Sequence, residues 1–130
     1  MTEAGLTIEE TESPVGDRQW VARTDVAWFG SPEEMYLTEI EPGELLLTVD
    51  VVTMIADAAL QSDLEDAIEL LVADERGVDR IDAEDRGDWY VDVQPDFDRD
   101  RLFERLHEVI FLGALRDRIE RYVRSDDYYP

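Results

Sequence analysis

A chain of 130 residues, 44% of them apolar, is long enough to bury one hydrophobic core and too apolar to be a disordered acidic tail. It carries 34 Asp and Glu residues against 12 basic residues, a formal net charge of −22, and all twelve basic residues are arginines. Because cysteine and lysine are both absent, the composition excludes disulfides, thiolate zinc sites, cysteine nucleophiles and a P-loop lysine.

The first segment predicts a loose lead-in followed by a strand. Residues 1–17 are polar and include Pro14 and Gly16, so we expect a flexible N-terminal lead-in. Over 18–28, alternate residues fall on one face of an extended chain, which predicts a strand with these residues on that face: Trp20, Ala22, Thr24, Val26 and Trp28.

The next stretch supports two interpretations. Ser31 and Glu34 have the spacing of a capping box with Pro32 between them, which predicts a short helix over 35–40 that ends before Pro42. The same residues also alternate in character, with Tyr36, Thr38 and Ile40 set against Met35 and Leu37, which predicts a strand.

Residues 44–75 predict a strand and then helices. The run 44–50 is of β type, and Asp50 is placed to cap a buried helix that continues to residue 60. One helix over 44–60 is the alternative, and periodicity does not choose between them. A second capping box at 62–65 predicts a helix over 63–75, with Gly77 as its C′ residue.

The last part predicts a hairpin and a long helix. Residues 78–93 read as two strands, the second with Trp89, Val91 and Val93 on one face. Residues 98–124 then carry helical periodicity, with Asp98 as the N-cap. Such a helix would be about 40 Å long. The alternative is a break at Gly113 that gives two shorter helices packed on one core.

Together these elements predict an α+β fold. We expect a small antiparallel sheet from segments near 18–28, 44–50 and 88–94, covered by helices near 63–75 and 98–124. A mostly α-helical bundle is the alternative. Residues 18–124 would form a single globular domain, and 125–130 a short tail.

The composition has a second meaning. High Asp and Glu content, arginine in place of every lysine and ordinary apolar content resemble the proteins of halophilic archaea, although no motif defines a family. The resemblance implies a cytoplasm of molar salt, where the Debye length is about 3 Å and self-repulsion is screened. The alternative is an acidic protein that binds a basic partner or mimics nucleic acid.

Charge is unevenly distributed along the chain. Residues 1–50 carry twelve acids and two arginines (−10), residues 51–100 sixteen and four (−12), and residues 101–130 six and six (zero). Between the two halves of the predicted C-terminal helix, apolar residues run nearly all round. We therefore expect a homodimer, or an unidentified protein partner, at this candidate interface: Val109, Ile110, Phe111, Leu112, Leu115, Ile119 and Tyr122.

Candidate chemistry is sparse. Asp96, Asp98 and Asp100 have the spacing that begins a calcium loop, but Arg101 stands where the loop needs glycine and His107 where it needs glutamate. We therefore predict no metal and no cofactor. His107 lacks a second histidine for a zinc pair, so we expect a partly buried or interface histidine.

Nucleic-acid binding and membrane insertion are not expected. The C-terminal arginines alternate with acids, and the whole-chain charge repels phosphate. The longest apolar run, 44–60, is interrupted by Asp50 and Asp57 and is too short to cross a bilayer. The first ten residues lack the features of a signal peptide, so we expect a cytoplasmic protein.

Three classes of function remain. The first is a non-enzymatic interaction or regulatory protein of a halophile cytoplasm that self-assembles through its C-terminal helix. The second is the acidic partner or mimic named above. The third is a small ligand-binding domain or enzyme that uses His107 and nearby carboxylates.

Overall fold

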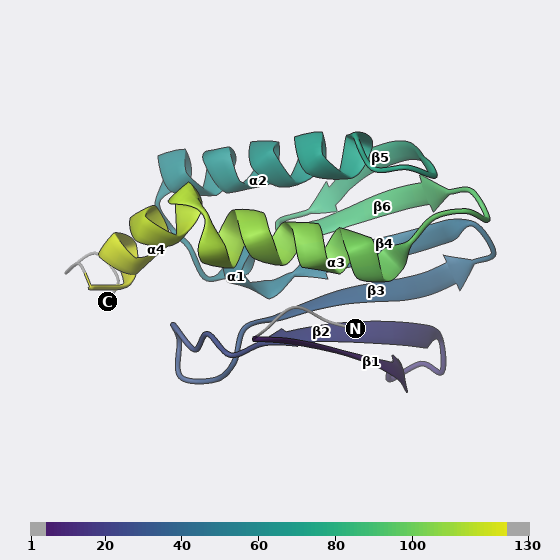
Figure 1. Ribbon diagram of the computed structural model, residues 1–130, viewed down its shortest axis with the longest axis horizontal. Helices are drawn as coiled ribbons and strands as arrows, with labels where there is room; N and C mark the ends of the chain where they lie inside the picture. The colour runs from purple at the N-terminus through teal and green to yellow at the C-terminus, as the bar shows by residue number, and fades with distance from the viewer. Residues whose placement is uncertain (1–4, 125–130) are drawn as a thin grey trace.

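A computed structural model describes residues 5–124. Within that range, six antiparallel strands form one sheet in the order β1-β2-β3-β4-β6-β5, and the helices lie on one side of it (Figure 1). The strands are β1 (Leu6–Glu12), β2 (Arg18–Thr24), β3 (Glu34–Glu41), β4 (Glu44–Val49), β5 (Val78–Asp85) and β6 (Asp88–Val93). The helices are α1 (Asp50–Thr53), α2 (Ala58–Ala73), α3 (Arg99–His107), the π-helical turn η1 (Glu108–Leu112) and α4 (Ala114–Arg124). The α+β prediction is confirmed, and the helical bundle is excluded.

The lead-in predicted for residues 1–17 is wrong where the structure describes it. Residues 6–12 form β1, which pairs with β2 from Leu6 opposite Thr24 to Glu12 opposite Arg18. Beyond its buried first residue, β1 is an edge strand exposed along most of its length, and acidic side chains suit such an edge. For this reason the sequence of β1 has the polar composition of a tail, although it forms a strand. Residues 1–4 and the predicted tail at 125–130 lie outside the described residues.

The helix predicted over 35–40 is also wrong, and the alternative strand is confirmed. Met35 and Leu37 are fully buried on the helix-covered face of β3, while Tyr36 points to the other face. Since β3 pairs with β2 on one side and β4 on the other, its backbone groups are satisfied across the sheet. This pairing outweighs the local capping signal at Ser31.

The strand predicted over 44–50 is confirmed as β4, but the helix after it is much shorter than expected. Helix α1 ends at Thr53, and its Asp50 is the first helical residue, with Val49 at the N-cap position. The side chain of Asp57 then caps α2 by accepting a hydrogen bond from the Leu60 amide at 2.9 Å. Helix α2 therefore begins five residues before the predicted start at 63, and the capping box at 62–65 lies inside it.

The C-terminal segment is two helices, as the broken alternative predicted. Asp98 caps α3, its carboxylate accepting a hydrogen bond from the Arg101 amide at 3.1 Å. Helix α3 widens into η1, and Gly113 then adopts an extended conformation before α4. The guanidinium of Arg116 donates to the Phe111 carbonyl at 3.1 Å, which satisfies one carbonyl freed by the break.

The core lies between the sheet and the helical layer. Helices α2 and α3 run side by side over the sheet, and both turn apolar residues toward it (Figure 1). In antiparallel strands, directly opposed residues share a face, so adjacent rows of pairs build this surface. Its largest fully buried members include Met35, Leu37, Leu47 and Trp89 from the sheet, and Leu64, Ile68, Leu102, Phe103 and Leu106 from the helices.

Gly77 was predicted to end α2, but the helix ends at Ala73 and Gly77 instead turns the chain into β5. Its φ is +86°, and an added Cβ would lie 2.7 Å from the Cα of Phe97. We expect Gly77→Ala to lower the free energy of unfolding by about 3 kcal/mol, from left-handed strain and a backbone clash. Gly30 has a φ of +99° and open space around it. Gly30→Ala is the control, with a loss of about 1 kcal/mol in urea unfolding; equal losses would contradict the packing argument.

Candidate functional site

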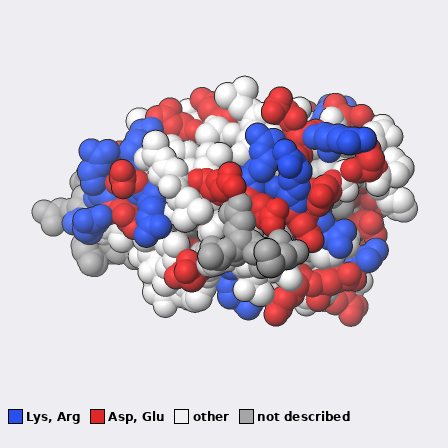
Figure 2. All heavy atoms as spheres, viewed as in Figure 1, with Lys and Arg blue, Asp and Glu red and all other residues white. Residues whose placement is uncertain are grey.

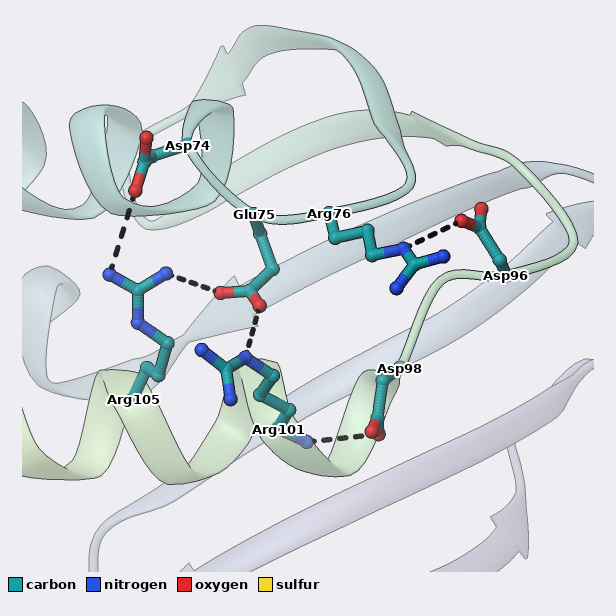
Figure 3. A network of polar contacts seen from close by, with 7 residues as sticks. All are labelled: Asp74, Glu75, Arg76, Asp96, Asp98, Arg101 and Arg105. Atoms are coloured by element: carbon teal, nitrogen blue, oxygen red, sulfur yellow. Dashed lines mark hydrogen bonds and ion pairs between the residues drawn. The ribbon is translucent and has the colours of Figure 1, made fainter.

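A charged hollow of about 600 Å³ lies between the end of α2 and the start of α3. It is the place where the structure brings part of the predicted Asp96–Asp100 cluster together with arginines (Figure 3). Four acids and three arginines line it: Asp74, Glu75, Arg76, Asp96, Asp98, Arg101 and Arg105.

Glu75 is the centre of this hollow. Its side chain is only 2% exposed, and it accepts hydrogen bonds from Arg101 Nε at 2.9 Å and Arg105 Nη1 at 2.6 Å (Figure 3). Arg105 also lies 3.8 Å from Asp74. These ion pairs hold the turn after α2 against α3. Both guanidiniums are already paired with carboxylates, so these ion pairs, which we call the clamp, join the two helices.

The three aspartates with the spacing of a calcium loop have different roles. Asp96 forms an ion pair with Arg76 at 3.1 Å, and Asp98 caps α3. Asp100 does not line the hollow; it lies in the first turn of α3, where a carboxylate favours the positive end of the helix dipole. Sequence reasoning considered Arg101 only as a residue that disqualifies a calcium loop and did not identify Glu75, its partner 26 residues earlier.

His107 is fully buried, and its ring centroid lies 5.9 Å from that of Phe111. It lines neither the charged hollow nor the second hollow described below. A side chain with no exposed surface has no access to a substrate, so this geometry offers no support for acid–base chemistry at His107.

The candidate interface of the C-terminal segment divides into two groups. Three of its residues are fully buried in the chain's own core, where Trp28 stacks on the Phe111 ring at 5.2 Å: Ile110, Phe111 and Ile119. A second copy could reach these three side chains only if the fold opened. Leu112 is 54% exposed, whereas the remaining members are half-buried: Val109, Leu115 and Tyr122.

The arginines of α4 are tied to their own chain. Arg118 pairs with Asp63 of α2 at 2.6 Å, and Arg116 pairs with Glu120 at 3.2 Å. Glu120 also accepts a hydrogen bond from Trp28 at 3.2 Å. This hydrogen bond is the largest cause of the lowered pKa of the Glu120 carboxyl, and the contacts with arginine add to it. Figure 2 shows the same pattern on the helical side, where arginines and acids interleave over α4.

The opposite face of the sheet is not covered by helices and carries an uncharged band. One row of paired residues crosses β2, β3, β4 and β6 on this face, and the adjoining row crosses β2, β3 and β4 before it reaches Asp88 on β6. Val21 and Thr38 are 6% and 8% exposed, and the others are half-buried. The uncharged band consists of Gln19, Val21, Tyr36, Thr38, Leu46, Thr48 and Tyr90. Sequence reasoning did not identify it, although the alternation in three of these strands was its signal.

One buried carboxyl has a strongly altered acidity. Glu33 is 5% exposed, and burial raises its pKa to about 7, with the nearby Asp50 carboxylate adding to the effect. Backbone N–H groups of Phe29 and Trp28 oppose the rise by hydrogen bonding to the carboxyl.

The clamp generates a stability prediction. We expect Glu75→Gln to lower the free energy of unfolding by about 2 kcal/mol, because it removes the buried charge from two arginines that remain partly exposed. The control is Asp63→Asn, which breaks an exposed ion pair with Arg118 and should cost about 0.5 kcal/mol. Urea unfolding in molar KCl measures both, and similar losses would contradict the central position of Glu75.

Glu33 generates a pH prediction. Because its folded-state pKa lies above the ordinary 4.5, its stabilising effect is complete below about pH 4.5 and is lost as the pH rises through about 7. Glu33→Gln keeps the side chain neutral at every pH. At pH 8 the free energy of unfolding of the variant should therefore exceed that of the wild type by about 2–3 kcal/mol, and at acid pH the two should be equal. The exposed Glu12→Gln serves as control for the general loss of charge. A constant difference from pH 5 to pH 8 would contradict the assignment.

Among residues 5–124, no group of three or more histidines or acids is arranged to hold a metal ion. No helix in the same range has the length and apolar character needed to cross a membrane. Comparison with models of known protein families, with curated proteins and with solved structures finds no match for this chain.

Proposed function

We propose that this protein is a non-enzymatic interaction or regulatory protein of a high-salt cytoplasm, and that it acts as a homodimer. The observation that carries the proposal is the uncharged band on the open face of the sheet. A second copy of the chain is the occupant we assign to it.

The band contrasts with the rest of the chain. Asp, Glu and Arg make up 35% of the residues, yet seven neighbouring positions across four strands carry no charge. Tyr36, Leu46 and Tyr90 supply aromatic and aliphatic surface there, and tyrosine is enriched at protein interfaces. An acidic protein adapted to salt gains solubility from charged side chains, so an uncharged central band favours burial.

Charged residues of both signs flank the band on each side. Arg23 lies on the β2 side, paired with Glu34 at 2.7 Å, and Asp88 and Asp92 lie on β6 at the other side of the band. A two-fold axis parallel to the strands would place the β2 side of one copy over the β6 side of the other. Arginine would then approach acids on both flanks of one interface.

The available area is of the right order. Six strands spaced about 4.8 Å apart and about 20 Å long give a flat face of roughly 550 Å². The accessible surface of a face studded with side chains is larger than this projection, and a standard interface buries about 800 Å² per partner. The C-terminal segment offers less, because Ile110, Phe111 and Ile119 are already buried.

The two chains would associate in molar salt. With a Debye length of about 3 Å, the repulsion between two chains of charge −22 is screened, and apolar contact decides association. The heavily acidic, lysine-free composition supports a halophile cytoplasm as that setting.

Light scattering in molar KCl tests the proposal, with an expected molar mass of twice 15.0 kDa. Leu46→Glu should give a monomer, because a two-fold interface would bring two buried carboxylates toward each other. Leu70→Glu, at a residue that is 74% exposed on α2, should remain a dimer.

A third variant separates the two possible surfaces. Leu112→Glu changes the most exposed apolar residue of the C-terminal segment and should leave the dimer intact. Loss of the dimer in Leu112→Glu but not in Leu46→Glu would move the interface to that segment. A monomeric wild type at the highest soluble concentration would contradict self-association itself.

A further inference from the structure

A second hollow of about 450 Å³ lies on the other side of the α3 N-terminus from the charged hollow. It opens between the β3–β4 turn, the end of β6 and the first residue of α3. Its volume is within the range of about 300–1,000 Å³ usual for small-molecule sites. Six of its residues are apolar: Trp20, Pro42, Leu45, Val93, Pro95 and Phe97.

Arg99 supplies a positive charge to this hollow. Its guanidinium carbon lies 4.3 Å from the centroid of the Trp20 ring, a cation–π contact that holds the group in place. Its Nε is buried and makes no hydrogen bond to any described residue, and its ion-pair partner Asp100 lies 4.0 Å away. By contrast, Arg18 on the same ring is hydrogen-bonded to Glu10 at 2.9 Å. The terminal Nη groups of Arg99, which make no hydrogen bond to a described residue, therefore remain as donors for a ligand.

Glu39 supplies a negative charge to the same hollow. It lies at an irregularity in β3, where the pairing with β4 shifts between Glu39 and Glu41. Such bulges re-aim side chains next to binding sites. Its carboxylate interacts with the charge of Arg18 but makes no hydrogen bond or close ion pair with a residue of the described chain, whereas Glu34 of the same strand is paired with Arg23.

We propose that this hollow binds a small zwitterion with an apolar side chain, that is, a free apolar α-amino acid. The ligand carboxylate pairs with the planar guanidinium of Arg99, and the ligand ammonium pairs with Glu39. The apolar side chain lies on the floor formed around Leu45, Val93 and Phe97. This assignment uses both charged residues of the hollow.

Net charge favours a zwitterion over a simple anion. A chain of charge −22 repels anions, and Glu39 inside the hollow adds to that repulsion, whereas a neutral zwitterion escapes it. A simple cation would leave Arg99 without a partner and next to a like charge. In molar salt the apolar contact keeps its strength while long-range attraction is screened, so zwitterion binding is retained under those conditions.

Isothermal titration calorimetry in molar KCl tests the proposal with three probes of one aromatic skeleton. L-Phenylalanine carries both charges, 3-phenylpropionate lacks the ammonium, and phenethylamine lacks the carboxylate. We expect phenylalanine to bind and each analogue to bind about tenfold more weakly or worse, since each loses one charged hydrogen-bonding group. No binding of phenylalanine, or equal binding of 3-phenylpropionate, would overturn the assignment.

Two variants locate the site, because each removes the protein group that should pair with one charged group of the ligand. Arg99→Gln should weaken phenylalanine about tenfold and bring its affinity down to that of phenethylamine. Glu39→Gln should likewise bring phenylalanine down to the affinity of 3-phenylpropionate. The matched controls are Arg86→Gln and Glu84→Gln, exposed residues at the β5–β6 hairpin that should leave all three affinities unchanged. Binding that survives both site variants, with folding checked by circular dichroism, would overturn the location.

Discussion

Six antiparallel strands make a sheet roughly 25–30 Å wide, whereas two helices packed about 10 Å apart cover roughly 20 Å of it. Helices α2 and α3 therefore cannot cover the whole sheet, and Figure 1 shows β1 and β2 extending beyond them. Apolar side chains fill part of the difference: Trp20 lies beneath Arg99, and Trp28 stacks on Phe111. The hollow beside Trp20 lies at the margin of the helical layer and follows from this mismatch in width.

The same two-layer plan leaves the other face of the sheet without a cover. Every strand has two faces, and the single helical layer buries only one of them. Val21, between Trp20 and Ala22, and Tyr36, between Met35 and Leu37, therefore point away from the helices. Where a protein has no further use for such a face, polar and charged residues occupy it. The uncharged band departs from that expectation, and a second sheet packed against it would restore a core on both sides.

Acidic excess imposes a separate constraint on how the helices are joined. With twelve arginines for 34 acids, few cations are available, and many of them make contacts at hydrogen-bonding distance. Screening over about 3 Å removes long-range attraction in molar salt but acts less on a buried carboxylate such as Glu75. Contact pairs from α3 to Glu75 and from α4 to Asp63 therefore hold the helical layer together where a general electrostatic field would not.

The sequence predicts those features whose cause is local. Alternation predicts the strand over 18–28, of which 18–24 forms β2, and it also predicts the strand over 44–50 and the hairpin from 78 to 93. A short side chain predicts the cap at Asp98, and a single glycine gave the break at Gly113 as the alternative to one long helix. Strand β3 and helix α2 depend on partners elsewhere. A capping box at Ser31 is overridden by strands on both sides, and Asp57 starts α2 ahead of the box at residue 62.

Neither hollow was predictable from the chain order, because Glu75 and Arg105 are 30 residues apart and Trp20 and Arg99 still farther. Only the fold brings them together. Successive residues of the 96–101 stretch then line different sides of one helix start, with Asp96 and Asp98 in the charged hollow and Phe97 and Arg99 in the apolar one. Arg101 and Arg105, both paired with buried Glu75, stabilise the structure, whereas Arg99, stacked on Trp20, is the residue we assign to a ligand. In a molecule covered with acids, both proposals place recognition at the few sites where charge is absent or incompletely paired.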